Sequence, residues 1–447
     1  MTVLVWVWLL LFAALLALVI RGGQRGGTLV LAYFAGLSLI HVPGALIYTS
    51  QVNYLVDAQV THTGFAATLL GLFSFVVGAW VAQLQRLKPA ADLGNPHLDY
   101  NRVGQTMLWL GFGAYSFAMP VLSFIPSATS IVSALGSLLP IGLWFWVHGA
   151  YVTHDRRRFL LGLAILPLLP LSTMVTGGFI GYGVFWVISV VAFVYCIVPR
   201  KRFFVLLAPA VLGLGLSFSV SYFGERNALR EGVWYQRADL GERMDRVWQM
   251  VAGFEWLDLD NPNHVVPIND RLNQNILVGQ AIELRERGLT KPAYGETVPL
   301  WTFIPRAIWP SKPAVGGSGD TVSRYTGQYF AEGTSVGIGQ PLEFYINFGR
   351  LGVVLGFALL GYALMRLDIR LAHAFKNHDI SCVLHAGLPG LALLQPGGSL
   401  MEILISFIGA LVAAPLVVRL LKKSGLLQNA LSLSGRSNTF PVYGQHL

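Results

Sequence analysis

Long apolar segments recur along the chain, and the short loops between them alternate in their content of Lys and Arg. Segments such as 9–20, 69–82 and 351–365 are too long and too uninterrupted for the core helices of a soluble domain. With their flanks they reach the ~20 residues that cross a hydrocarbon layer. Only 12% of the residues are charged, whereas soluble domains carry about 25%. The pattern predicts an all-α polytopic membrane protein.

The apolar segments divide the chain into about eleven transmembrane helices and one long polar loop. We expect spans at 3–20, 28–49, 65–85, 104–124, 129–149, 159–175, 179–198, 203–222, 341–365, 380–396 and 402–420. The predicted organisation is helices 1–8 in 1–222, a folded loop in 223–340, helices 9–11 in 341–420, and a cytoplasmic tail in 421–447.

The distribution of basic residues predicts the orientation. The loops after spans 2, 4, 6 and 10 contain neither Lys nor Arg, whereas the other short loops and the tail are basic. Because cytoplasmic loops are enriched in Lys and Arg, the N-terminus and the long loop are expected outside and the C-terminus inside. The basic loops carry Arg21, Arg25, Arg86, Lys88, Arg102, Arg156, Arg157, Arg158, Arg200, Lys201, Arg202, Arg366, Arg370 and Lys376, and the tail region carries Arg419, Lys422 and Lys423.

The net charge of +9 does not indicate a nucleic-acid partner. Residues 223–338 hold 12 Lys and Arg against 14 Asp and Glu, so the excess lies in the short loops, where orientation signals belong. Cys196 and Cys382 are the only cysteines, and both adjoin apolar spans near basic loops. No disulfide framework and no metal site are expected from them.

The long loop is expected to fold, because it contains five tryptophans and few low-complexity stretches. Residues 269–287 are predicted to form one helix that ends at Gly288. Residues 320–330 are predicted to form a second, with Ser318 or Asp320 as N-cap. Residues 296–309 are apolar, Trp-rich and broken by proline, which is typical of a segment lying at the membrane interface.

Proline and glycine mark irregular places in the spans. Pro167 and Pro170 predict a kink in the sixth span. Pro389, Pro396 and the pair Gly397–Gly398 favour a broken or re-entrant helix near 380–402. The glycine-rich run 177–183 lacks a following basic residue, so close helix packing is expected there, and not phosphate binding.

Three cations follow one another ahead of the ninth span, at Arg306, Lys312 and Arg324. A diphosphate carried on a lipid needs such cations near the membrane surface, since Arg offers a bidentate fork and Lys a point charge. The alternative is that these side chains reach lipid headgroups or pair with nearby carboxylates.

Two carboxylates are the candidate general bases. Glu343 lies where the long loop enters the ninth span, and an ionisable residue at that depth is a functional candidate. Glu296 lies within the same polar stretch. A partly desolvated carboxylate can take a proton from a sugar hydroxyl. The alternative for Glu343 is an ion pair with Arg350 or Arg306, and Asp320 is better explained as a helix cap.

The stretch 294–352 resembles the bacterial oligosaccharide repeat-unit polymerases, the Wzy-like O-antigen and exopolysaccharide polymerases. The resemblance lies in Tyr-Gly-Glu at 294–296, in Ile-Pro-Arg-x-x-Trp-Pro-x-Lys-Pro at 304–313, and in Glu-x-x-x-Asn-Phe-Gly-x-x-Gly at 343–352. The layout of many spans with one long outer loop before the last few is also similar. An arginine followed by glycine eleven residues later, a spacing associated with the family, occurs at Arg230 and Arg306, but 49 glycines produce it by chance.

The resemblance implies a fold, a reaction and a set of site residues. It implies a GT-C-like membrane glycosyltransferase that needs no metal or other cofactor and joins repeat units carried on undecaprenyl diphosphate. Arg306, Lys312 and Arg324 would hold the diphosphate and Glu343 or Glu296 would act as base. Trp301, Trp309 and Asn347 would contact the sugars.

The resemblance also implies a place and partners. The chain would lie in the bacterial inner membrane with its N-terminus in the periplasm, beside a flippase and a chain-length regulator. An O-antigen ligase shares this layout and remains an alternative. A lipid-linked oligosaccharide transporter and a non-enzymatic assembly factor are the others.

Overall fold

The computed structural model describes residues 1–22, 26–49, 57–85, 99–122, 125–199, 202–234, 239–298, 304, 308–309, 311, 318–330 and 336–426. Helices and turns make up this part of the chain, and it contains no strand. The helices are α1 Thr2–Arg21, α2 Thr28–Ile47, α3 Ala58–Leu84, α4 Tyr100–Gly113, the π-helix η1 Ala114–Ala118, α5 Met119–Leu122, α6 Pro126–Gly136, α7 Leu138–Val152, α8 Arg156–Ala164, α9 Leu168–Gly177, α10 Gly181–Ile197, α11 Arg202–Trp234, α12 Leu240–Ala252, α13 Pro262–Leu272, α14 Asn275–Glu286, α15 Ser318–Thr326, α16 Gln340–Lys376, α17 Ile380–Ala392 and α18 Leu400–Lys423.

The helices confirm a helical membrane protein. In the described part, seven segments are long and apolar enough to cross a bilayer, and α10 and α17 are shorter apolar helices. The seven are Thr2–Arg21, Thr28–Ile47, Ala58–Leu84, Ala128–Val152, Arg156–Gly177, Gln340–Lys376 and Leu400–Lys423. Many large apolar side chains on them remain exposed, as surfaces that face lipid do.

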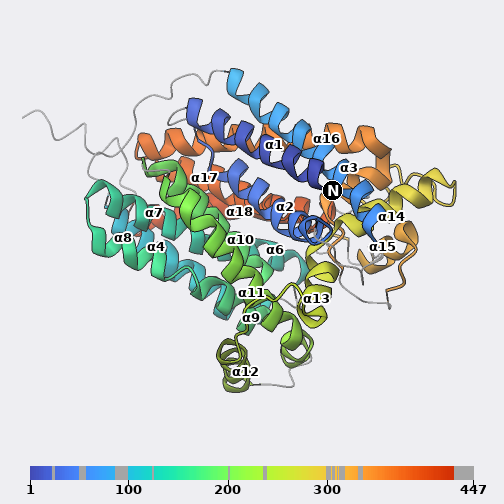
Figure 1. Cartoon of the computed structure of the whole chain (residues 1–447). Helices are drawn as coiled ribbons and strands as arrows, with labels where there is room; N and C mark the ends of the chain where they lie inside the picture. Colours follow the sequence, from blue (N-terminus) through green and yellow to red (C-terminus); the bar gives the residue numbers. More distant parts are fainter. Residues whose placement is uncertain are drawn as a thin grey trace, which may run out of the picture.

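Helices α2, α3 and α16 lie side by side in the body of the molecule (Figure 1). Small residues let α3 and α16 approach closely. A Cβ on Gly78 would lie 1.9 Å from the carbonyl oxygen of Ala358, and one on Gly361 would lie 2.1 Å from that of Phe75. Close backbone contact through glycine is the usual way that helices associate where no water drives them together.

Asp368 on α16 joins that helix to the start of α2. Its carboxylate accepts hydrogen bonds from the backbone N–H groups of Leu29 at 2.8 Å and Val30 at 2.9 Å. The side chain is fully buried. The first N–H groups of a helix have no partner within the helix, so an acid from a distant segment performs the role of an N-cap for α2.

Replacing Asp368 with alanine should destabilise the protein by about 3 kcal/mol, because two buried N–H groups lose a charged acceptor. The measurement is thermal unfolding of the purified protein in detergent. Asp379→Ala is the matched control, since Asp379 caps only its own helix, α17, through the N–H of Cys382. It should cost about 1 kcal/mol. Equal losses for the two variants would contradict the joining role of Asp368.

The described connections between helices lie at two opposite ends of the helical body. At one end the Gln83 side chain donates to the Leu18 carbonyl, Arg366 donates to the Gln85 carbonyl, and the Tyr100 hydroxyl contacts His378 Nδ1 at 2.5 Å. Arg366 and, beside Tyr100, Arg102 lie at this end, and we call it the basic end. At the other end lie the N-terminus, α14 and α15 (Figure 1). We call it the outer end.

The long loop is docked onto the ends of α2 and α3 by α13 and α14. The prediction of one helix over 269–287 is wrong, because α13 ends at Leu272 and α14 begins at Asn275. The break has a tertiary cause. The Gln274 N–H bonds to the carbonyl of Ile40 at 3.0 Å, so this backbone group is used for contact with α2.

The docking of α14 requires glycines. A Cβ on Gly64 of α3 would lie 1.9 Å from the Asn275 carbonyl oxygen, and one on Gly279 of α14 would lie 2.0 Å from that of Val60. Gly64→Ala should therefore destabilise the protein by about 3 kcal/mol and expose α14 to added protease. Gly181→Ala, where nothing lies within 4 Å of the added carbon, is the control. Unchanged protease resistance of Gly64→Ala would contradict this packing.

The helix boundaries elsewhere agree with the predictions at some positions and differ at others. The kink at Pro167 is confirmed, since α8 ends at Ala164 and α9 begins at Leu168. The helix predicted over 320–330 is present as α15, with its start at Ser318. In the predicted span 380–396, the helix stops at Ala392. In the run 177–183 the close packing is confirmed at Gly183, where a Cβ would lie 2.3 Å from the Cα of Pro170, whereas nothing lies within 4 Å of one on Gly181.

Candidate functional site

The first turns of α16 place Glu343 and Asn347 one helical turn apart at the outer end. Both side chains are buried, with exposed fractions of 1% and 3%. Glu343 Oε2 accepts the N–H of Leu400, the first residue of α18, at 2.6 Å. The predicted ion pair between Glu343 and Arg350 is absent from the described contacts, because Arg350 faces Glu286 at 3.5 Å.

Asn347 fixes the turn at 294–297. Its Oδ1 accepts the N–H of Gly295 at 2.7 Å, and its amide donates to the Thr297 hydroxyl at 2.9 Å. Tyr294 and Gly295 both have positive φ, at 46° and 93°. A non-glycine residue rarely adopts that conformation, so Asn347 holds a strained turn against α16. Its burial and its partners assign it to positioning this turn.

The turn presents Glu296 to solvent. The Glu296 carboxylate lies 3.9 Å from Arg324 of α15, and both side chains are more than two-thirds exposed. An exposed pair at this distance contributes little to stability. Two of the residues predicted for the site are thus brought together, and their exposure leaves both accessible to a ligand.

A kink in α16 follows directly. Phe348 and Gly349 leave the helical conformation, and Gly349 has φ 63° and ψ −151°, a region open to glycine. Arg285 of α14 spans the kink. Its Nη1 donates to the Tyr345 carbonyl at 3.0 Å and its guanidinium lies 5.4 Å from the Tyr345 ring centre. The kink frees carbonyl groups, and this arginine satisfies one of them.

A buried amide network holds the long loop in place below this site. His41 of α2 bonds to Asn275 at 2.7 Å, and Asn275 donates back to the His41 carbonyl at 2.7 Å. Asn273 donates to Thr61 of α3 and to Asn269 of α13, at 3.1 and 2.9 Å. Networks whose members are mutually bonded rigidify a unique arrangement, so the outer helices form part of the same body as α2 and α3.

Three arginines gather where α11 leaves its predicted span. Arg226 and Arg230 are half-buried and one helical turn apart on α11, and Arg271 ends α13, which packs against α11. The guanidinium of Arg230 lies 4.2 Å from the centre of the Phe179 ring. The Tyr222 side chain lies close enough to Arg226 to raise its pKa slightly against the effect of burial. We call Arg226, Arg230 and Arg271 the arginine cluster.

The like charges of the cluster affect one another. Burial lowers the pKa of Arg226, and the charge of Arg271 lowers it further. Burial lowers the pKa of Arg230 to about 10, again with contributions from Arg226 and Arg271. With a pKa of about 10, Arg230 stays protonated at neutral pH. A bound anion would offset this repulsion and the cost of holding two guanidinium groups partly out of water.

The acidic residues near Arg226 and Arg271 do not neutralise these two arginines directly. Within the part of the chain that the structure describes, neither Arg226 nor Arg271 forms an ion pair. Asp270 is near enough that Arg271 lowers its pKa, yet burial raises the pKa of Asp270 on balance. Arg226 and Arg271 therefore contribute unneutralised positive charge at the outer end.

Several predicted site residues cannot be placed. Arg306, Lys312 and Trp301 lie outside the described residues. Trp309 is described and partly exposed, and its indole N–H donates to Ser311 at 3.2 Å.

His264 is buried and bonds to Glu255 at 3.1 Å, so it is a satisfied histidine. No group of three metal-ligating side chains occurs among the residues that were placed.

Part of the arginine cluster is visible in the sequence, although its members were not among the predicted site residues. Arg226 and Arg230 stand at i and i+4 just beyond the predicted eighth span, at the end that the sequence predicts to lie outside. Outer ends of spans are ordinarily poor in Arg, so two arginines on one helix face there are candidates for binding an anion. Arg271 is distant in sequence and only the fold brings it near.

Comparison with known proteins adds no identity: no family model, no curated protein and no solved structure matches this chain.

Proposed function

We propose that this chain is a polymerase that joins lipid-linked oligosaccharide repeat units into a surface polysaccharide, such as an O-antigen, capsule or exopolysaccharide. The arginine cluster at the outer end is the observation that carries the proposal. The half-buried Arg226 and Arg230, the latter beside the aromatic ring of Phe179, suit a diphosphate whose lipid tail stays in the membrane. The resemblance of residues 294–352 to this family supports the same reaction.

The proposed reaction transfers a growing glycan from one carrier to the next. The bond between the anomeric carbon and the diphosphate oxygen breaks, and the electron pair leaves with undecaprenyl diphosphate. A hydroxyl of the incoming repeat unit forms the new glycosidic bond and gives up its proton. Fixed cations stabilise the departing diphosphate without reorganising, which is the role that we assign to Arg226, Arg230 and Arg271.

The reaction needs two lipid-linked substrates bound at once, so two cationic sites for diphosphate groups are required. The arginine cluster supplies one. The sequence-based assignment of Arg306, Lys312 and Arg324 supplies the second, and Arg324 lies beside Glu296. Trp301 and Trp309 are assigned to sugar contacts in the same segment. No metal or other cofactor is part of the proposed mechanism.

Glu296 is the better candidate for the base, because it is exposed while Glu343 is 1% exposed. A general base must come within hydrogen-bond reach of the hydroxyl that it deprotonates. Glu343 bonds to the start of α18, and its α16 neighbour Asn347 holds the turn that presents Glu296. We therefore assign Glu343 and Asn347 to positioning.

The proposed location is the bacterial inner membrane, with the outer end in the periplasm and the C-terminus in the cytoplasm. The separation of the basic loops from the end that carries α14 and α15 supports this orientation. A GT-C-like architecture and eleven spans belong to the proposal, as do a flippase and a chain-length regulator as partners.

Loss of the gene separates the proposed function from its alternatives. A strain lacking a polymerase should accumulate single repeat units on the carrier at the periplasmic face. Loss of an O-antigen ligase would instead accumulate long carrier-linked chains, and loss of a transporter would leave single units facing the cytoplasm. The measurement is the chain length and sidedness of lipid-linked glycan, with re-expression of the wild-type chain as control. Long chains in the deletion strain would overturn the proposal.

A further inference from the structure

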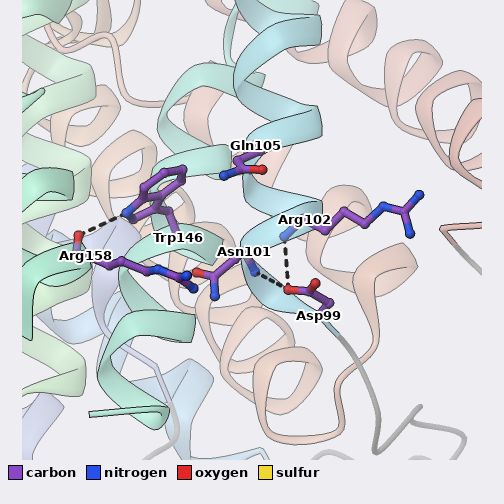
Figure 2. A pocket seen from close by; sticks show the side chains of 6 residues that line it. All are labelled: Asp99, Asn101, Arg102, Gln105, Trp146 and Arg158. Atoms are coloured by element: carbon purple, nitrogen blue, oxygen red, sulfur yellow. Dashed lines mark hydrogen bonds between the residues drawn. The ribbon is translucent and has the colours of Figure 1, made fainter. Parts of the chain in front are cut away.

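A polar pocket opens at the basic end, far from the arginine cluster. It has a volume of about 350 Å³ and lies where α4 and α8 begin and α7 ends. A pocket of this size can hold a small polar group. Figure 2 shows its lining, which consists of Asp99, Asn101, Arg102, Gln105, Trp146 and Arg158.

Arg158 is held at the pocket with its tip available. Its Nε bonds to Asp155 at 3.1 Å, and the Asp155 carboxylate also accepts the backbone N–H of Arg158 at 3.0 Å. The side chain extends toward Asn101 (Figure 2). In the described part of the chain, the two terminal nitrogens of Arg158 have no hydrogen-bond partner. The guanidinium is therefore held in place and can still donate hydrogen bonds to a ligand.

Polar side chains complete the lining. The Asn101 side-chain oxygen is buried and lacks a hydrogen-bond partner among the placed residues. The other atom of this amide, the Asn101 nitrogen, is a donor that a ligand acceptor can meet. Gln105 offers a second amide from the next turn of α4 (Figure 2).

The acids nearby are already engaged. Asp99 Oδ1 accepts the backbone N–H groups of Asn101 and Arg102, both at 3.1 Å, as the N-cap of α4. Asp155 caps α8 and pairs with Arg158. Arg156 and Arg157 are exposed on the first turn of α8, and Arg102 is exposed at the rim. The surroundings are positive on balance.

The walls place the pocket at membrane height. The Trp146 indole donates to the Arg158 carbonyl at 3.0 Å and so fixes the start of α8 against α7. Tryptophan concentrates at the membrane–water interface. Basic pockets between transmembrane helices at the end that carries the basic loops bind anionic lipid headgroups.

We propose that this pocket binds the phosphate of an anionic glycerophospholipid, with the Arg158 guanidinium as the fork and Asn101 and Gln105 as further donors. The phosphate oxygens accept hydrogen bonds from the terminal nitrogens of Arg158 and from the amide nitrogens of Asn101 and Gln105, and the acyl chains lie along the apolar surface of the helices. The site does not depend on the proposed glycan chemistry, because it rests on residues at the opposite end of the body.

Thermal unfolding of the full-length protein in detergent tests the proposal. Phosphatidylglycerol should raise the unfolding midpoint in a saturable way, and phosphatidylcholine should have a weaker effect. Arg158→Gln should raise the half-saturating concentration of phosphatidylglycerol about tenfold, since it removes a charge-assisted hydrogen bond. Arg419→Gln, which changes an exposed arginine near the end of α18, is the matched control and should bind as the wild type does.

A second variant and a second ligand distinguish a lipid headgroup from free phosphate and show whether a loss of binding comes from misfolding. Gln105→Leu removes a donor from an exposed position without touching the Asp155 cap and should weaken the same response. Inorganic phosphate that raises the midpoint as much as the lipid would overturn the assignment to a lipid. Unchanged lipid binding by Arg158→Gln and Gln105→Leu, or an equal loss in Arg419→Gln, would overturn the site.

Discussion

Changing Arg226 and Arg271 together to glutamine should lower the rate of chain extension by about 100-fold or more. Glutamine keeps some hydrogen-bonding capacity but removes two of the three charges that would stabilise the departing diphosphate. Removing one donor that stabilises charge developing in a reaction commonly costs about 10²–10³ in rate. The measurement is extension of lipid-linked repeat units by the reconstituted protein.

The arginine cluster offers a well-matched control. Arg287 is an exposed arginine of the same outer region that pairs with Glu283 on its own helix. Arg287→Gln removes one outer charge without touching the cluster, so extension should stay within about twofold of the wild type. An equal loss in Arg287→Gln would show that overall charge, and not the cluster, controls the rate. Unaltered extension in the double variant would remove the cluster from the site.

Glu296→Gln should lower the extension rate at saturating substrate by about 10²–10⁴, the usual contribution of a general base. The substitution keeps the size of the side chain and changes only its ability to take a proton. The acid limb of the pH–rate profile should also disappear, because that limb reports the essential base. Reconstituted protein assayed across pH provides both measurements.

Two further variants separate the base from the residues that position it. Glu286→Gln removes an exposed carboxylate that faces Arg350 and should leave the rate unchanged. Glu343→Gln keeps an oxygen that can accept the Leu400 N–H, so it should retain most activity, while Glu343→Ala should lose it together with thermal stability. A normal acid limb in Glu296→Gln, combined with its loss in Glu343→Gln, would reverse these two roles.

The sequence predicted those features that depend on local pattern. Apolar length predicted a helical membrane protein, and seven described segments are long and apolar enough to cross a bilayer. Pro167 identified the break between α8 and α9 because proline removes a helical hydrogen bond. The helix predicted over 320–330 occurs as α15, which begins at Ser318 and ends at Thr326. Each of these signals is contained within one or two helical turns.

Features that depend on distant partners were beyond the pattern. The interruption at 273–274 exists because Asn273, Gln274 and Asn275 bond to α2 and α3, and no local residue there is a helix breaker. The burial of Glu343 likewise depends on the start of α18, which lies 57 residues away. The predicted choice between Glu343 and Glu296 as base therefore needed the packed structure.

The arginine cluster combines both kinds of information. The i, i+4 spacing of Arg226 and Arg230 is local and visible in the sequence. Arg271 joins them because α13 packs on α11, and Phe179 joins because α9 and α10 turn back beside the same helix end. The contact between α13 and α11 thus adds a third arginine to the two on one helix face, and the three together form a candidate binding site.

Equilibrium binding of undecaprenyl diphosphate to the purified full-length protein tests the central claim most directly. The wild type should bind it saturably and about tenfold more tightly than undecaprenyl monophosphate, since the second phosphate adds a charge for the cluster to hold. The variant with Arg226→Gln and Arg271→Gln should lose that preference. Equal binding of both lipids by the wild type, or an unchanged preference in the variant, would contradict the account.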